Sequence, residues 1–436
     1  MNDRTPMDGF AGALLAVESF SDGHAVLHGP GGCRNYHTFL SSQCVPRSEP
    51  GDQERFAGKY FMGMPRLPCT FVDEDDYING TEEKLVDCIP YVCGSDPDGF
   101  FVFVQSPGAS LIGDRIGDLI SEAGLSDRAL AIEESLISQP FAPSYDHTLR
   151  SILSWKKPEK RRVRKGTVNI IGIPVTSNDW KDALKDLSDD LGSMGLEVVC
   201  ALGAGCSLDD MNRSVEAEFN VVVQMEYCRR TAELYLESYG IPWICYEGGA
   251  PVGFDAYESW IHLIAETAKA DPEPVLKRIK AAKRRAYDVI SSSALAKRTE
   301  FHRFSCIADS SIALPLTMWL RSYLRMIPSA IVLEDGAFDP YAERLEEFLK
   351  EIGCAEALGK DIGPGTGYLF ADGNYAALAE KTGRCVKGID INRPSMHRVG
   401  FIPRPVFGVT GAMHILDEIF RRNGPRWRPR PPGKGS

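Results

Sequence analysis

A cysteine follows a glycine-rich turn near the start of the chain. The apolar run 24–27 ends in His28-Gly-Pro-Gly-Gly, and Cys33 comes directly after this turn. Glycine permits backbone angles and close approaches that side chains forbid, so the pattern predicts a tight turn at the start of a helix. The amide groups of a helix N-terminus, together with the neighbouring Arg34, favour the thiolate, which is the form of cysteine that binds metal. The alternative interpretation is a structural turn with an inert cysteine.

The composition is that of a globular protein with excess negative charge. The chain has 436 residues, of which 43% are hydrophobic, and a net charge of −11. This charge argues against nucleic acid as a partner. The sequence lacks the ~18 uninterrupted apolar residues of a membrane helix. Its first residues also lack the basic block and the apolar block of a signal peptide. We therefore expect a cytoplasmic protein without a membrane partner, in which the twelve cysteines stay reduced.

Apolar runs separated by helical segments predict three α/β units in series. Strands joined by helices of ~10–16 residues form parallel sheets that are covered on both faces. The expected strands are 100–105 in the first unit, 168–173, 197–202, 220–225 and 242–247 in the second, and 304–308, 330–333, 367–370 and 385–391 in the third. The expected domains are 1–155, 166–272 and 298–424, followed by a disordered tail at 425–436. Residues 38–68 are expected to form a long irregular loop beside the cysteine turn.

Several short motifs follow one another in a fixed order along the chain. They are His28-Gly-Pro-Gly-Gly-Cys33, the segment 73–85, Ile112-Gly113-Asp114, the segment 168–172, Tyr239-Gly-Ile-Pro-Trp243 and the segment 405–411. In this order they resemble component 1 of the nitrogenase family, including its relatives that reduce tetrapyrroles. The resemblance extends from residue 8 to residue 420.

The resemblance implies a fold, a cofactor and two kinds of partner. The family fold is α/β, with three Rossmann-like domains whose parallel sheets surround a central cleft, which agrees with the three units predicted above. Such proteins pair with a homologous component 1 subunit, of like or unlike sequence, and share an iron–sulfur cluster between their N-terminal domains. A separate ATP-dependent iron protein supplies electrons to that cluster. The cleft holds a second metallocofactor in nitrogenases and the substrate itself in tetrapyrrole reductases.

The cluster ligands of the family carry over only in part. Cys33 matches the cysteine that follows the His-Gly-Pro turn, whereas the other two cysteine positions fall at Asp8 and Pro107. A carboxylate can ligate iron and a proline cannot, although thiolates are the usual cluster ligands. The resemblance then favours a four-iron cluster over an eight-iron one, completed by a partner chain. Cys44 and Cys69 are further candidate ligands.

The cleft residues carry over in part as well. The cysteine that holds the nitrogenase cofactor is replaced by Gln224, with Cys228 one helical turn further on. A histidine ligand is expected near His397 and Arg398, and His397 could also act as an acid because it titrates near neutral pH. Glu247 ends a predicted strand on the cleft side and could position a substrate or a proton. The alternatives are helix packing for Cys228 and an ordinary surface carboxylate for Glu247.

These features predict a subunit of a nitrogenase-like reductase, an oxidoreductase component 1. It would pass low-potential electrons from an ATP-dependent iron protein, through an interface cluster held by Cys33 and Asp8, to a substrate or metallocofactor in the cleft. The alternative is a non-catalytic scaffold for metallocluster assembly or a sister subunit that completes the dimer. Gln224 argues against dinitrogen as the substrate, which leaves a tetrapyrrole or a small organic molecule.

Overall fold

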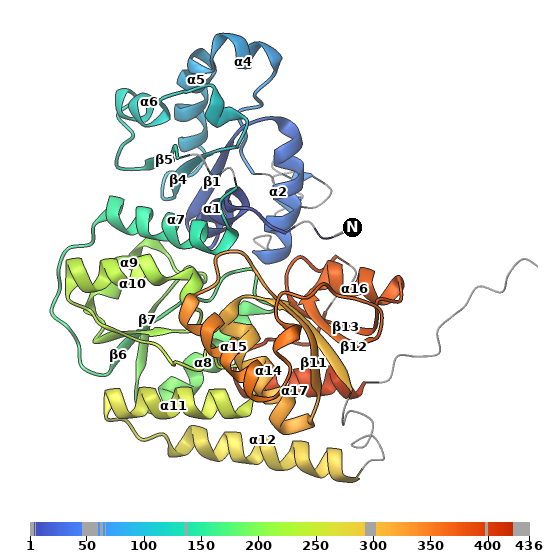
Figure 1. Ribbon diagram of the computed structural model, residues 1–436. Helices are drawn as coiled ribbons and strands as arrows, with labels where there is room; N and C mark the ends of the chain where they lie inside the picture. Colours follow the sequence, from blue (N-terminus) through green and yellow to red (C-terminus); the bar gives the residue numbers. More distant parts are fainter. Residues whose placement is uncertain are drawn as a thin grey trace, which may run out of the picture.

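Three parallel sheets organise the protein. The computed structural model describes residues 4, 6–45, 60–61, 64–65, 67–134, 136, 138–292, 302–396 and 400–421. Figure 1 shows one α/β part at the top, which is blue to teal, and two below it, one green and one orange to red. Among the described residues, no helix has the length and apolar character needed to cross a membrane.

The first part has a three-stranded sheet in the order β1-β4-β5. Its strands are β1 (Gly23–His28), β4 (Phe100–Gln105) and β5 (Ala129–Ile132), and a small hairpin is formed by β2 (Tyr60–Phe61) and β3 (Met64–Pro65). Its helices are α1 (Gly9–Glu18), α2 (Gly31–Cys44), α4 (Glu74–Asn79), α5 (Glu82–Cys93), α6 (Ile116–Glu122) and α7 (Phe141–Lys156), with a 3₁₀ turn at Ala109–Leu111. Every residue of β4 is buried, as expected for a central parallel strand.

Helix α1 is buried along its whole length and packs closely against α7. A Cβ on Gly12 would lie 2.4 Å from the Phe141 carbonyl oxygen, so glycine is what permits this approach. Helix α7 in turn contacts α10 (Arg229–Leu234) of the second part. The buried Asp146 carboxylate on α7 accepts hydrogen bonds from the backbone amides of Arg230 (2.7 Å) and Thr231 (3.0 Å) at the start of α10. These contacts join the first part to the second.

The second and third sheets share one topology. The second has the order β7-β6-β8-β9 and the third β11-β10-β12-β13, and all pairs in both are parallel. Their strands are β6 (Thr167–Ile171), β7 (Glu197–Leu202), β8 (Phe219–Val222) and β9 (Trp243–Ile244), and β10 (Arg303–Ala308), β11 (Ile327–Leu333), β12 (Thr366–Asp372) and β13 (Cys385–Asn392). In each sheet the second strand of the chain pairs with one side of the first strand, and the third strand pairs with its other side. This reversal creates a switch point where ligands of open α/β sheets bind.

Helices cover both of these sheets. They are α8 (Trp180–Ser193), α9 (Leu208–Arg213), α10 (Arg229–Leu234) and α11 (Phe254–Ala268) in the second part, the connecting α12 (Glu273–Ser292), and α14 (Ser310–Leu324), α15 (Asp339–Glu351), α16 (Gly373–Lys381) and α17 (Gly408–Phe420) in the third. Helix α17 contacts α8, α11 and α12, so the end of the described chain packs on the second part.

The predicted fold class, α/β with three Rossmann-like parallel sheets, is confirmed. The sheets lie within 1–155, 166–272 and 298–424, whose limits stay predictions, and the tail 425–436 lies outside the described residues. The expected loop 38–68 is wrong at its start, because α2 continues to Cys44 with His37, Leu40, Ser41 and Cys44 facing the interior. Strand β5 has no counterpart among the expected strands, and the expected strand 242–247 is reduced to Trp243–Ile244.

Candidate functional site

The glycine-rich turn lies at the carboxyl end of β1 and leads into α2, as the sequence predicts. Pro30 is the N-cap of α2, and Cys33 is the third residue of the helix. A Cβ on Gly29 would lie 2.5 Å from the Ser106 hydroxyl, so the turn contacts the loop that follows β4. A Cβ on Gly32 would meet no described atom within 4 Å, so the helix start is open on that side.

A buried hydrogen-bond network fixes this turn. Thr70 accepts from the Gly29 amide (3.1 Å) and its hydroxyl is 3.0 Å from His28 Nδ1, while His28 Nε2 is 3.2 Å from Asp114 Oδ2. Asp114 also accepts from the Thr81 amide (3.2 Å) and hydroxyl (2.6 Å). Because burial lowers the pKa of His28 despite the Asp114 charge, its ring is neutral at pH 7. Nδ1 then accepts from Thr70, and Nε2–H donates to Asp114.

Two half-buried thiols, Cys33 and Cys69, lie beside this turn. The chain after β3 runs next to β1, because Thr70 N–H donates to the Leu27 carbonyl at 3.1 Å. Within it, the Cys69 thiol donates to the Gly29 carbonyl at 3.2 Å. Burial raises the pKa of Cys69, and the nearby Cys33 raises it further. The two thiols are therefore neighbours at the carboxyl end of β1, although their residues are far apart in the sequence.

Asp8 acts on Cys33 from the start of α1. Burial raises the pKa of Cys33, and the Asp8 charge adds to this rise. A backbone hydrogen bond at the helix start does lower the pKa of Cys33, but burial and Asp8 outweigh it, so the expected net preference for the thiolate is wrong. The Arg34 guanidinium instead donates to the Leu67 carbonyl (3.0 Å), and its charge lowers the pKa of Cys69. Asp8 is exposed and caps α1 by accepting from the Ala11 amide at 2.9 Å.

The two remaining ligand candidates lie elsewhere. Cys44 is at the far end of α2, about 16 Å from Cys33 along the helix axis. It is buried, and burial raises its pKa to about 12. Pro107 lies in the loop after β4 and offers no ligand atom. Within the described part of the chain, no group of three or more His, Cys, Asp or Glu side chains could hold a metal ion by itself.

A cavity of about 280 Å³ opens where the three parts meet. The first part contributes Tyr36 and Phe141 and the second contributes Tyr227, while the third contributes residues after three of its strands. Asp309 follows β10, Glu334 follows β11, and Asp372 ends β12. The cavity therefore lies at the switch point of the third sheet, where ligands of this sheet type bind.

Gln224 lies behind this cavity and joins the second sheet to the third. Its side chain is fully buried and donates to Asp309 Oδ2 and to the Ser311 hydroxyl, both at 3.3 Å. The Tyr227 hydroxyl donates to the same Asp309 oxygen at 3.0 Å. Burial and the charges of Glu226 and Glu334 raise the pKa of Asp309 well above its usual value, against the effect of these hydrogen bonds.

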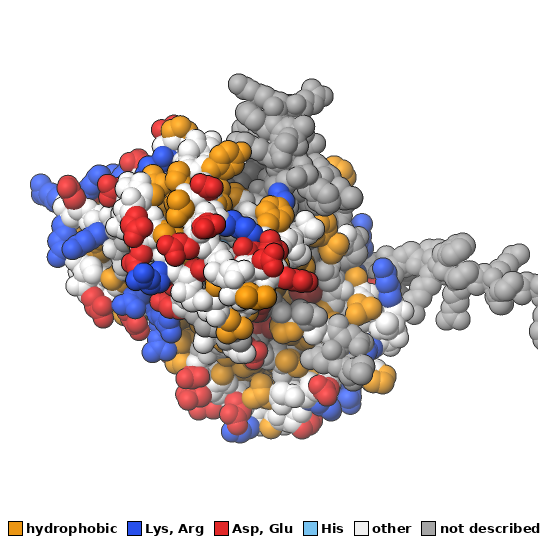
Figure 2. Space-filling view, turned by 90° about the horizontal axis from the view of Figure 1, so that it is seen from above, with side chains coloured by type: hydrophobic (Ala, Val, Ile, Leu, Met, Phe, Trp, Pro, Cys, Tyr) orange, Lys and Arg blue, Asp and Glu red, His pale blue; other side chains and the backbone are white. Residues whose placement is uncertain are grey.

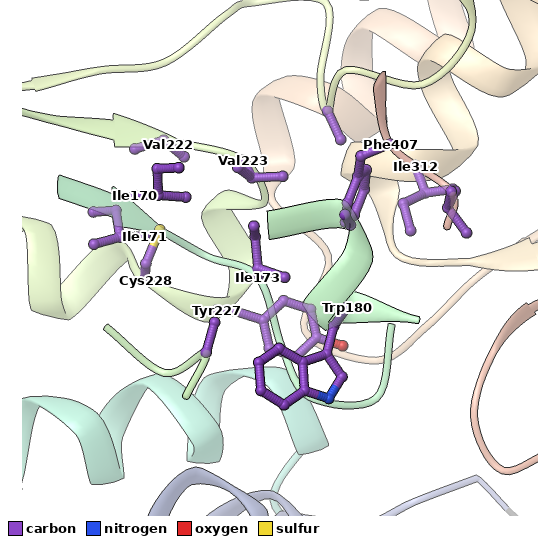
Figure 3. Close-up of a cluster of buried hydrophobic side chains, with 14 of the residues drawn as sticks. Ile170, Ile171, Ile173, Trp180, Val222, Val223, Tyr227, Cys228, Ile312 and Phe407 are labelled. Atoms are coloured by element: carbon purple, nitrogen blue, oxygen red, sulfur yellow. The ribbon is translucent and has the colours of Figure 1, made fainter. Parts of the chain in front are cut away.

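The other predicted cleft residues do not line the cavity or are not described. Cys228 is buried, its thiol donates to the Gln224 carbonyl at 3.3 Å, and it belongs to the hydrophobic cluster of Ile170 and Ile171 (Figure 3). Glu247 is exposed and pairs with Arg344 at 3.0 Å. His397 and Arg398 lie outside the described residues.

Sequence reasoning misses the charged lining of the cavity. This lining includes Arg4, Asp309, Glu334 and Asp372. A signal is present for the three acidic residues, since each lies at or just after the carboxyl end of a predicted strand. Arg4 carries no such signal, because only the tertiary fold brings it to the third sheet.

One titration on α2 gives a testable stability effect. His37 is 7% exposed and packs edge-on against the Phe10 ring, and burial lowers its pKa to about 4. The unfolded chain binds a proton near pH 6.5 and the folded chain only near pH 4. The contribution of His37 to stability is therefore present above pH 6.5 and is lost as the pH falls to 4. Over this range the free energy of unfolding decreases by about 3 kcal/mol.

His37→Phe is expected to remove this part of the pH dependence. Urea unfolding at pH 7, 5.5 and 4.5 should show a smaller loss of unfolding free energy on acidification than in the wild type. His262→Gln, a change at an exposed histidine, serves as the control. Equal pH dependence of His37→Phe and the wild type would contradict the assignment.

Comparisons with known proteins agree with this architecture. The chain matches the family model of nitrogenase component 1 type oxidoreductases over residues 9–422. It is 23% identical over 243 residues to a subunit of the light-independent protochlorophyllide reductase of Rippkaea orientalis, covering 53% of this chain and 45% of the relative. The corresponding subunit from Rhodopseudomonas palustris is 27% identical over 121 residues, which cover 28% of this chain and 22% of the relative. The chain thus spans less than half the length of the curated relatives it matches.

Two solved structures share the fold. Nitrogenase Cp1 at pH 6.5 superposes with a TM-score of 0.73 at 13% identity, covering 96% of this chain and 93% of that one. Nitrogenase Cp1 at pH 5 gives 0.64 at 17% identity, covering 97% and 91%. At these identities the likeness shows the fold alone. The family match over nearly the whole chain settles its membership: the chain belongs to the nitrogenase component 1 type oxidoreductases.

Proposed function

We propose that the chain is a subunit of a nitrogenase-like reductase of the cytoplasm. It accepts low-potential electrons from an ATP-dependent iron protein through an iron–sulfur cluster at a subunit interface. The electrons pass to a substrate in the central cavity. The observation that carries the proposal is the neighbouring pair of thiols, Cys33 and Cys69, with Asp8 acting on Cys33.

These residues fit part of a cluster site. Thiolates are the usual ligands of a four-iron cluster, and a carboxylate can replace one of them. Cys33, Cys69 and Asp8 are fewer donors than such a cluster needs, so a homologous subunit, like or unlike, supplies the rest. When bound, the cluster stores and passes single electrons. Because the pKa of both thiols is raised, binding iron releases protons and is favoured at higher pH.

The surface above the first sheet supports docking of a partner. Helix α4 begins with Glu74, Asp75 and Asp76, and Ile78 on the same helix is 80% exposed. Figure 2 shows acidic and hydrophobic side chains mixed over this face. Exposed apolar side chains with a charged rim are typical of protein interfaces. We assign this face to contact with a basic surface, such as one on the iron protein.

The cavity favours an organic substrate over a metallocofactor. Among the described residues that line it there is no cysteine and no histidine, the usual ligands of such cofactors. This observation also favours the second candidate function, a scaffold or sister subunit whose own cavity holds no cofactor. The sister subunit would then carry the reaction.

Anaerobic purification of the chain with its co-purifying partner tests the proposal. We expect about four iron and four sulfide per subunit pair, and reduction that requires both the iron protein and ATP. A metal-free complex would contradict the cluster, and full activity without the iron protein would contradict the electron route. A complex that holds iron but reduces nothing under these conditions would favour the scaffold.

A further inference from the structure

We propose that the central cavity binds a cationic organic ligand through a guanidinium, amidinium or ammonium group, and that Arg4 of the same chain occupies the place of that group. The inference rests on the proposed function, because it names the ligand class of the same cavity. It is carried by the charged side chains of the lining and by their hydrogen bonds.

Carboxylates converge on the cavity from three adjacent strands. The sheet order β11-β10-β12 places the ends of these strands side by side, so Glu334, Asp309 and Asp372 meet at one edge. Asp335 also lines the cavity. The cations of the lining are Arg4 and Arg393, and Arg393 donates to Asp179 at 3.2 Å. The described residues of the lining therefore carry more negative than positive charge.

Arg4 shows that this edge accommodates a planar cation. Its guanidinium donates two hydrogen bonds to Glu334, one of them at 2.8 Å from Nη1 to Oε2. Its Nε donates to Asp372 Oδ2 at 2.9 Å. Such two-pronged pairing of a guanidinium with a carboxylate is both strong and geometrically selective. A ligand with the same donor pattern could make the same bonds if Arg4 withdrew.

Asp309 supplies a further acceptor that is not used. Its side chain is 5% exposed, and both hydrogen bonds that it receives from described residues, from Gln224 and Tyr227, fall on Oδ2. Its second oxygen, Oδ1, accepts no hydrogen bond from the described part of the chain. Because Asp309 lines the cavity, a donor group on a bound ligand could reach this oxygen.

This charge pattern disfavours an anionic ligand. A tetrapyrrole carboxylate would face the carboxylates of Glu334 and Asp372 in this cavity, where repulsion between like charges disfavours its binding. A diamine or guanidino compound is attracted by the same residues. The sequence leaves open a tetrapyrrole or a small organic molecule as the substrate. The charges of the cavity favour the small organic molecule.

Calorimetric titration of the full-length chain with its partner tests the proposal, with agmatine as the cationic probe and succinate as the anionic one. We expect Arg4→Ala to bind agmatine at least tenfold more tightly than the wild type, because the competing guanidinium is gone. Arg115→Ala is the matched control, since Arg115 is exposed and pairs only with Asp118 among the described residues. Arg4→Ala combined with Glu334→Gln should lose the gain.

Three outcomes would overturn the proposal. They are equal agmatine affinity of Arg4→Ala and the wild type, an equal gain in Arg115→Ala, and tighter binding of succinate than of agmatine. Thermal unfolding, followed by circular dichroism, verifies that each variant is folded. If Arg4→Ala does not fold, Arg4→Gln, which changes the shape of the side chain less, provides the same comparison. Iron content is measured in parallel, because a cluster without agmatine binding refutes only this ligand class, and absent iron refutes the proposed function.

Discussion

Cys33→Ala is expected to remove the interface cluster and to reduce reductase activity to background. The thiol lies in the first turn of α2, directly after a turn that is fixed by the hydrogen bond between His28 and Thr70. Alanine leaves the helix intact and removes only the ligand atom. Iron per subunit pair, and the electron paramagnetic resonance signal after dithionite reduction, measure the loss directly.

Cys44→Ala is the matched control, because it removes a thiol from the same helix. Cys44 is buried at the other end of α2, and the Trp180 indole donates to its backbone carbonyl, which alanine retains. We expect a modest loss of stability, about 1 kcal/mol, and an unchanged iron content. Unchanged iron in Cys33→Ala, or equal losses in both variants, would show that Cys33 is not a ligand.

Two conservative changes separate ligation from local structure. Cys69→Ser keeps a donor for the Gly29 carbonyl and exchanges the thiolate for a much weaker iron ligand. Asp8→Asn keeps an oxygen that caps α1 at Ala11 and removes the carboxylate charge. If Cys69 and Asp8 ligate iron, each change lowers the iron content with little effect on the melting temperature. A fall in melting temperature with full iron content would assign them structural roles.

The fold can be predicted largely because its strands are short apolar runs. The predicted strands 100–105 and 197–202 have the bounds of β4 and β7. The errors arise where the local pattern is weak. Strand β5 has only Ala129 and Ile132 buried. The inner face of α2 mixes the polar His37, Thr38 and Ser41 with Leu40 and Cys44, so it does not resemble a hydrophobic stripe.

The site can be predicted only where its residues are close in sequence. Cys33 stands in a local motif that also contains its turn. Cys69 lies close to Cys33 because the chain after β3 pairs with β1. This contact joins segments that are far apart in the sequence, so the hydrophobic periodicity of the sequence does not predict it. The cavity acids follow the same rule, since Asp309 and Asp372 meet only through the strand order of the third sheet. The apolar runs predict their strands but do not predict that strand order.

Asp114→Ala is expected to destabilise the protein by about 3–5 kcal/mol, because it leaves three hydrogen-bond donors without their acceptor, and to lower its iron content. The carboxylate is buried and accepts from His28 Nε2 and from the Thr81 amide and hydroxyl. Alanine leaves these donors without an acceptor in a site that excludes water. Because His28 ends β1 directly before the glycine turn, its release also loosens the start of α2, where Cys33 lies.

Asp118→Ala, on the same segment, supplies the comparison for this effect. Asp118 is exposed and pairs with Arg115 one helical turn away, an arrangement worth less than about 0.5 kcal/mol. In urea unfolding, Asp114→Ala should therefore be less stable than Asp118→Ala by several kcal/mol. Iron analysis should show that Asp114→Ala also holds much less iron. If Asp114→Ala unfolds like Asp118→Ala and retains its iron, the network does not position the turn. If it loses stability but not iron, the network supports the fold while Cys33 is held by α2 alone.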